Sequence, residues 1–414
     1  MANDLTRRSL LIGAGGAAVA APAIVRAQGA STRRIAVIGA GVFGTWTAEH
    51  LRRAGHAVTL VDALGAAHSR ASSGGESRMT RAGYGKDEIY SRMARDSLVE
   101  WKILSARSGL PIFVEHGVLF FTSKADAYFA DSLAVNHRIG LPIVEMNRVQ
   151  MAQRFPMMDF AGVETGFFES GFGALMARRA VQTLAEQITS AGVIQRRMAV
   201  ASVRTTGRRA EAVLDKTGAA IDADLFVFAL GPWLAKIFPD ILGKRIVATR
   251  QEVFYFAPPA GDDGFAPGAM PGWADFNGGD VYYGFPDLEG KGVKFAHDAH
   301  GVEVDPDTQS RTYSKAALDD VIAVRDRRFP RLRGAPLIGA EVCQYENSSN
   351  GDFLIDRHPT ISNVILVGGG SGHGFKHGPE VGRLAAALAV SDDPQRESRF
   401  TLATKSKAQK REVI

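Results

Sequence analysis

A glycine-rich turn near the start of the chain limits its fold more than any other feature. The segment "IAVIGAGVFG" places a short apolar run, residues 35–38, before the spacing G-x-G-x-x-G. A helical stretch follows, and then a second apolar run, 58–61, that ends in an acid. The first glycine of such a motif makes a tight turn, the second lets the backbone approach a pyrophosphate, and the third allows close helix–strand packing. The pattern predicts a βαβ dinucleotide site formed by Gly39, Gly41, Gly44 and Asp62.

Two later stretches bear on which dinucleotide is bound, because Asp62 suits an adenosine ribose without a 2′-phosphate but does not separate FAD from NAD. The stretch "ADLFVFALGPW" is an apolar strand that ends at Gly231. The stretch "VILVGGGSGHGFKHGPEVGRLAA" is a second strand, glycine turn and helix, and it contains Gly372 and Gly374. A flavin can use this second helix N-terminus to stabilise its reduced, anionic ring, whereas nicotinamide enzymes rarely need one. FAD is therefore favoured.

The first 29 residues have the pattern of an export signal. Arg7 and Arg8 precede a weakly apolar Ala/Gly-rich stretch, 10–25, and small residues precede Gln28 at a plausible cleavage site. This pattern predicts a twin-arginine signal and a periplasmic or secreted protein that uses the twin-arginine export machinery. A disordered amphipathic leader and an uncleaved anchor remain alternatives.

The rest of the composition is that of an ordinary globular protein of two or three domains, with 45% hydrophobic and 22% charged residues. The formal charge of +5 is scattered along the chain, which argues against nucleic-acid binding. No later apolar run approaches the roughly 18 to 20 residues that span a bilayer, so no stable membrane span is expected.

One cysteine stands alone in 414 residues, in the stretch "EVCQYENSSNGDFLIDRHP". A free cysteine is most often a small buried hydrophobe. In an oxidising compartment, however, an unpaired thiol should be blocked, buried or used covalently. Cys343 therefore needs either a packing role or a chemical one.

Together these stretches resemble the monomeric sarcosine oxidase family, which includes N-methyltryptophan and pipecolate oxidases among the D-amino-acid-oxidase-like FAD amine oxidases. The resemblance covers about residues 33–400. Its most specific parts are the arginine pair in "ASSGGESRMTRAGYG", the stretch "YYGFPDLEGKGVKF", the cysteine with "DFLIDRHP", and "SGHGFK". It implies an FAD-dependent amine oxidoreductase that acts on CH–NH bonds, with the flavin joined to Cys343 by a thioether.

The resemblance also implies roles for individual residues. Arg81 and Lys376 match the clamp for the substrate carboxylate, while Arg78 and His373 match catalytic positions at the flavin ring. Lys294 matches the lysine that activates O₂, and Tyr283 matches a catalytic and substrate-binding tyrosine of the active-site cage. The implied reaction transfers hydride from carbon to flavin N5, after which the imine hydrolyses and O₂ reoxidises the flavin to give H₂O₂.

The chain departs from the family pattern four residues after Lys294, where sarcosine-type members have a histidine and this chain has Asp298. Either a neighbouring histidine is displaced in register or the cage contains an acid. An acid would suit a substrate with an extra cationic group, and it makes sarcosine itself doubtful. The spacing of His297 and His300 lacks a third ligand, so no metal site is predicted.

The order of the motifs predicts an α/β fold with a Rossmann-type FAD-binding domain, similar to that of glutathione reductase, and an inserted antiparallel α+β substrate domain. The FAD-binding domain takes residues 30–114, 172–246 and 336–400, and the substrate domain takes 115–171 and 247–335. Residues 401–414 are polar and basic and are expected to form a mobile tail.

Other functions remain open at this point. The same fold can pass electrons to a quinone or another acceptor instead of O₂, and a non-catalytic flavin-bearing protein is a further alternative. An NAD-dependent dehydrogenase would leave Cys343 and the second glycine turn without a role. The sequence does not identify the amine, the oligomeric state, or the role of residues 344–351.

Overall fold

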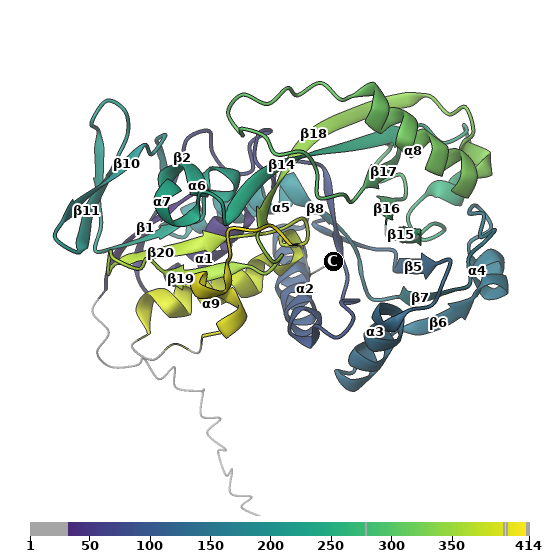
Figure 1. Ribbon diagram of the computed structural model, residues 1–414, viewed down its shortest axis with the longest axis horizontal. Helices are drawn as coiled ribbons and strands as arrows, with labels where there is room; N and C mark the ends of the chain where they lie inside the picture. Colours follow the sequence, from purple (N-terminus) through teal and green to yellow (C-terminus); the bar gives the residue numbers. More distant parts are fainter. Residues whose placement is uncertain (1–31, 278–279, 392–393, 395, 411–414) are drawn as a thin grey trace, which may run out of the picture. The chain divides into compact units, whose positions relative to one another are not determined.

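The computed structural model describes residues 32–277, 280–391, 394 and 396–410. The predicted export signal lies outside the described residues. The chain from Arg33 onward forms one compact unit built around two large sheets (Figure 1). No helix in the described part of the chain is both long and apolar enough to cross a membrane.

The first large sheet has six strands in the order β19-β20-β13-β1-β2-β9. Five of them run parallel, and β19 adds an antiparallel edge. The central strands are continuous apolar runs, as expected for strands covered on both faces. The strands are β1 (Arg34–Ile38), β2 (Ala57–Asp62), β9 (Ile194–Arg197), β13 (Leu225–Phe228), β19 (Leu354–Arg357) and β20 (Val364–Gly368).

Four helices share one hydrophobic core with this sheet: α1 (Val42–Arg53), α2 (Glu88–Ser108), α5 (Ala177–Ser190) and α9 (Gly378–Val390). Helices α1 and α9 pack closely because Gly382 lies against Trp46, where a Cβ would be 2.6 Å from the backbone carbon. The opposite face packs on α6 (Leu234–Ile237), α7 (Pro239–Leu242) and a meander of β10 (Ser202–Thr206), β11 (Arg209–Leu214) and β12 (Ala220–Asp222).

The second large sheet has eight strands in the order β18-β14-β17-β16-β15-β5-β7-β6. Helix α8 (Lys315–Arg328) shares a core with one of its faces. The strands are β5 (Val118–Thr122), β6 (Val144–Asn147), β7 (Thr165–Glu169), β14 (Ile246–Phe256), β15 (Gly272–Asn277), β16 (Asp280–Phe285), β17 (Val293–His297) and β18 (Leu337–Ser348).

Smaller elements connect the two sheets. Strands β3 (Ser77–Thr80), β8 (Gly173–Met176) and β4 (Phe113–Glu115) form a three-stranded sheet. Helices α3 (Ala127–Arg138) and α4 (Arg148–Arg154) lie next to β6 and β7, and short 3₁₀ turns include η1 (Gly231–Trp233) and η4 (Phe375–His377).

One predicted domain boundary is wrong. Residues 337–348, which we assigned to the FAD-binding domain, form strand β18 at the edge of the eight-stranded sheet. This strand pairs with β14 from Ile246↔Ser348 to Phe256↔Leu337. Motif order could not reveal this pairing, because it joins segments about ninety residues apart.

The expectation of a mobile tail at residues 401–414 also differs from the structure, which describes this segment as far as residue 410. Leu402 is buried and its N–H donates to Asp356 Oδ2 at 2.9 Å. The N–H of Ser406 donates to Ser349 Oγ at 2.9 Å, and Lys405 is buried despite its charge. These contacts attach residues 401–410 to the sheet edge, which composition alone did not indicate.

Candidate active site

The first glycine turn is sterically forced. Gly39 has φ +106, and a Cβ there would lie 2.2 Å from the carbonyl oxygen of Ala229. A Cβ on Gly44 would lie 1.8 Å from the carbonyl oxygen of Gly39. On Gly41 it would meet only Ser73 Oγ, at 3.5 Å, so this glycine leaves open space at the start of α1. These are the three roles that the spacing predicts.

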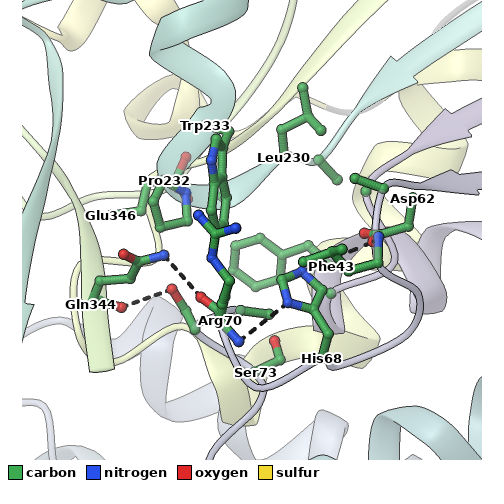
Figure 2. A pocket seen from close by; sticks show the side chains of 18 of the residues that line it. Phe43, Asp62, His68, Arg70, Ser73, Leu230, Pro232, Trp233, Gln344 and Glu346 are labelled. Atoms are coloured by element: carbon green, nitrogen blue, oxygen red, sulfur yellow. Dashed lines mark hydrogen bonds and ion pairs between the residues drawn. The ribbon is translucent and has the colours of Figure 1, made fainter. Parts of the chain in front are cut away.

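A cavity of about 670 Å³ begins at this turn (Figure 2). Asp62 lines it and accepts hydrogen bonds from the N–H groups of Ala40 at 2.9 Å and of Leu64 and Gly65 at 2.8 Å. Gly231, with φ +54, lines the same cavity. Asp62 therefore both faces the cavity and holds the backbone turns at Ala40 and at residues 64–65 in place.

The loop after β17 holds one side of this cavity in place. Trp233 Nε1 donates to Asp307 Oδ1 at 2.7 Å, and Arg70 Nη2 donates to the carbonyl of Asp307 at 3.0 Å. Arg70, Trp233 and Asp307 all line the cavity. Segments far apart in the sequence thus meet at its rim.

A second, smaller pocket of about 80 Å³ adjoins the first. Residues from β3, from β18 and from the second glycine turn line the two spaces together: Arg78, Cys343, Tyr345, Gly372 and Phe375. A planar ligand at this boundary would form a wall of the smaller pocket.

Two buried cations line the smaller pocket. The guanidinium carbon of Arg81 lies 4.2 Å from the ring centre of Tyr84, and Lys376 Nζ lies 5.2 Å from it. Arg81 Nη1 also donates to the carbonyl of Gly83, and Lys376 Nζ donates to the carbonyl of His373 at 2.8 Å. The structure therefore brings together the predicted carboxylate clamp from positions almost three hundred residues apart.

A buried acid holds the backbone beside Arg81. Glu169 accepts a hydrogen bond from the N–H of Ala82 at 3.1 Å and one from Asn136 Nδ2 at 3.1 Å. Burial raises the pKa of Glu169 to about 7, although these hydrogen bonds and Arg81 lower it. The sequence analysis did not identify Glu169, because nothing near it in the sequence marks a site.

Arg78 and the lone cysteine are in contact. Arg78 Nη2 lies 3.4 Å from Cys343 Sγ and donates to the carbonyl of Ser72 at 2.5 Å, while Nη1 donates to the carbonyl of Ser77 at 2.8 Å. Cys343 is half-buried and lies at the boundary between the two spaces. It is therefore not an inert core residue.

Lys294 is buried close to this pair but lines neither space. Its Nζ donates to the carbonyl of Ser77 at 3.1 Å and lies 5.1 Å from the ring centre of Phe285. Burial, followed by the charge of Arg78, lowers the pKa of Lys294 to about 7, and Glu341 partly opposes this shift. The ammonium can therefore gain or lose its proton near neutral pH.

Tyr283 lines the smaller pocket from β16. Burial raises its pKa to about 12, with Asp298 as the next contribution, and the hydroxyl forms a hydrogen bond with Tyr345. Burial lowers the pKa of Arg81, but Tyr128, Tyr84, Glu169 and, least of these, Asp298 raise it above its ordinary value. The predicted cage tyrosine and the acid therefore share one pocket with the clamp.

The alternation of β17 decides the question of register raised by Asp298. Lys294, Ala296 and Asp298 share one side of the strand, since side chains alternate along it. His297 points to the other side, where Nδ1 lies 3.0 Å from Asp320 Oδ2 and the ring stacks on Tyr282. Both His297 and Asp298 line the smaller pocket, and the His297 ring is held by Asp320 and Tyr282. No group of three or more His, Cys, Asp or Glu side chains in the described ranges is arranged to hold a metal ion.

Both ring nitrogens of His373 are engaged. Nε2 lies 3.0 Å from the carbonyl of Gly351, and Nδ1 lies 3.1 Å from the hydroxyl of Tyr84. The same hydroxyl lies 2.8 Å from His377 Nε2. A carbonyl can only accept, so Nε2 of His373 is the donor to Gly351. His373 thus lines the smaller pocket while supporting Tyr84.

Sequence reasoning missed Tyr84, although it lies three residues after Arg81 in the quoted stretch "TRAGYG". Its face carries the two clamp cations, and its hydroxyl bridges two histidines. A buried tyrosine beside two arginines was an available signal for such a role.

Comparison with known proteins places these observations in a family context. The model of the family described as FAD dependent oxidoreductase matches residues 34–388. Monomeric sarcosine oxidase of Bacillus sp. (strain B-0618) is 28% identical over 373 residues, which cover 86% of this chain and 92% of that protein. N-methyl-L-tryptophan oxidase of Salmonella arizonae is 27% identical over 365 residues, which cover 86% and 95%.

Solved structures share the fold. L-proline dehydrogenase from P. horikoshii superposes with a TM-score of 0.78 at 19% identity, covering 90% of this chain and 97% of its own. Fructosamine oxidase from Aspergillus fumigatus (Amadoriase II) has a TM-score of 0.74 at 23% identity, covering 88% of each chain. The predicted fold class, a parallel sheet with an antiparallel substrate sheet, is confirmed.

Proposed function

This chain belongs to the FAD dependent oxidoreductase family, and we propose that it oxidises the CH–NH bond of a secondary amine or of an N-alkyl or imino amino acid. One observation carries the proposal: a pocket lined by two buried cations opens directly onto the cofactor cavity. The names of the sarcosine and N-methyltryptophan oxidases, at 28% and 27% identity, support this substrate class.

The residues of the larger cavity fit FAD. Its volume of about 670 Å³ is in the range of sites that hold large small-molecule ligands. Gly41 leaves room for a phosphate at the N-terminus of α1, and Asp62 lines the adjoining space. The opposite end reaches Cys343 and Tyr345. Bound FAD would supply the hydride acceptor at this end.

The chain's own residues would bind and orient the substrate. Arg81 can bind a carboxylate in a bidentate manner, and Lys376 adds a point charge. A carboxylate held there places the adjacent C–H and nitrogen in the small pocket, close to the cofactor cavity. Asp298 shares this pocket and suits a substrate with a second cationic group.

The products follow from the proposed chemistry. Loss of hydride and a proton from the amine gives an imine, and water hydrolyses the imine to a carbonyl compound. The two electrons pass to O₂, which becomes H₂O₂. Lys294 supports O₂ as acceptor, because a cation stabilises superoxide as it forms. A quinone or another acceptor is the second possibility, since L-proline dehydrogenase shares the fold.

Substitution of the clamp lysine tests the substrate class. Lys376→Met is expected to raise KM about 10- to 100-fold for N-methyl amino acids and cyclic imino acids, because one charged hydrogen bond contributes about 1.5–3 kcal/mol. Initial rates of peroxide formation provide the measurement, and amines lacking the carboxylate should show little change. Lys315→Met, on an 83% exposed side chain, is the control. Equal effects on amines with and without a carboxylate would contradict the clamp. Reduction of a dye by the enzyme without peroxide formation would favour a dehydrogenase that uses an acceptor other than O₂.

The pH dependence of reoxidation tests Lys294. Its pKa is lowered to about 7, so the ammonium is charged below that pH and neutral above it. The rate of flavin reoxidation by O₂ is expected to fall as the pH rises through about 7 or somewhat higher, since a negative charge on the cofactor would raise this pKa. Lys294→Met should be about 10²-fold slower and independent of pH over this range, as measured by stopped-flow absorbance. An unchanged pH profile in this variant would exclude the role.

We further propose that the flavin is covalently bound. Cys343 lies where the two spaces meet, next to a guanidinium, which suits a thioether to the 8α-methyl group. The new C–S bond replaces the thiol S–H and one methyl C–H, and the two electrons released pass to O₂ as H₂O₂.

Acid denaturation tests the thioether. The wild-type polypeptide should stay yellow after acid precipitation, and its Cys343 peptide should carry the mass of FAD. Cys343→Ser should release all colour into the supernatant, because no other thiol is present in the sequence. A colourless wild-type pellet would disprove the covalent bond.

Finally, we propose export by the twin-arginine pathway, which is supported by Arg7, Arg8 and the small residues before Gln28. Mass spectrometry of the protein recovered from the periplasm should find Gln28 as the first residue. The double substitution Arg7→Lys and Arg8→Lys should keep the uncleaved protein in the cytoplasm. Export unaffected by this double substitution would contradict the proposal.

A further inference from the structure

Glu346 is a buried acid that lines the cofactor cavity. It lies on β18, three residues after Cys343, and is 6% exposed. Its side chain is among those that line the cavity, together with Gln344 and Pro232 (Figure 2). It also touches the second glycine turn, where a Cβ on Gly368 would lie 2.3 Å from Glu346 Oε1.

The carboxyl group lacks the partners that a buried charge needs. Oε1 has no hydrogen-bond partner among the described residues, and within the same residues Glu346 forms no ion pair. Burial raises its pKa to about 8, although the N–H groups of Gly369 and Gly370 lower it. A buried carboxyl without a cation is held in its neutral form.

The surrounding elements supply no countercharge. The strand on one side, β14, places Ala248 opposite Glu346. Lys236, on α6, lines the same cavity, but its ammonium is paired with Asp305 and Asp307. Arg78, at the far end of the shared lining, contacts the cysteine sulfur.

We propose that Glu346 is a neutral carboxylic acid that donates a hydrogen bond to an oxygen or nitrogen acceptor of the FAD in this cavity. A protonated carboxyl has one O–H donor, which an acceptor on the cofactor would satisfy. FAD offers many such acceptors along its polyol chain and ring. This inference rests on the cofactor of the family and not on the amine substrate.

A purely structural role makes a different prediction. If Glu346 only supported the glycine turn, its ionisation would leave the bound flavin unchanged, and any side chain of similar size would serve. If it donates to FAD, loss of its proton places a negative charge beside the cofactor. The visible absorption of the flavin would then report that titration.

The experiment is a pH titration of the visible spectrum of oxidised holoenzyme, without substrate, from about pH 6 to pH 10. Wild type should show a one-proton transition at or somewhat above pH 8, since burial raises the pKa of Glu346 to about 8 and donation to FAD would raise it further. Lys294→Met, which removes the lysine whose pKa is lowered to about 7, should keep this transition. Glu346→Gln, which keeps a donor but cannot ionise, should show no transition and retain its flavin. In the Cys343→Ser background, where no thioether can retain the flavin, Glu346→Met, similar in size but without a donor, should bind FAD about two- to tenfold more weakly than Cys343→Ser alone, since one hydrogen bond is about 0.5–1.5 kcal/mol.

Several results would overturn the proposal. These are a wild-type spectrum that stays constant across the range, persistence of this same transition in Glu346→Gln, or an unchanged affinity for FAD when Glu346→Met is added to Cys343→Ser. Because the wild-type titration needs no variant, a misfolded substitution would not remove the test. Because no amine is added, the outcome is also independent of whether the substrate proposal holds.

Discussion

The long antiparallel pairing of β14 with β18 is the interaction on which the site depends. It holds residues 337–348 against 246–256 and belongs to the eight-stranded sheet. The far end of β18 reaches the second glycine turn, where the N–H of Ser371 donates to the carbonyl of Glu346 at 2.9 Å. One strand thus joins the substrate sheet to the cofactor cavity and places Cys343 at their junction.

Several cationic side chains lie around this junction, where the two spaces meet. Arg81, Lys294 and Lys376 are buried near the two spaces, and Arg78 is half-buried. Carbonyl groups, aromatic rings and a cysteine sulfur surround them, with few carboxylates in direct contact. Such an arrangement favours anions, which is consistent with a carboxylate-bearing substrate and a flavin that becomes negative on reduction. Burial, followed by the charge of Arg78, lowers the pKa of Lys294 to about 7.

Much of the fold was predictable, because the glycine spacing and the apolar runs on either side of it are local signals. Gly39 and Gly44 show in their steric contacts why no other residue fits. The arginine pair and Lys376 were recognisable only through a family resemblance. Tyr84, Glu169 and Glu346 were missed because their roles depend on burial and on partners that lie 80 to 290 residues away or on another sheet.

By itself, the sequence determined a βαβ turn and a second glycine turn, since both follow from backbone sterics. Only the tertiary structure decided that β18 leaves the cofactor domain for the substrate sheet. It also decided that Asp298 lines the smaller pocket while the ring of His297, whose residue lines it too, is held by Asp320. These outcomes depend on long-range strand pairing and on desolvation, which arise when distant segments pack together and exclude water.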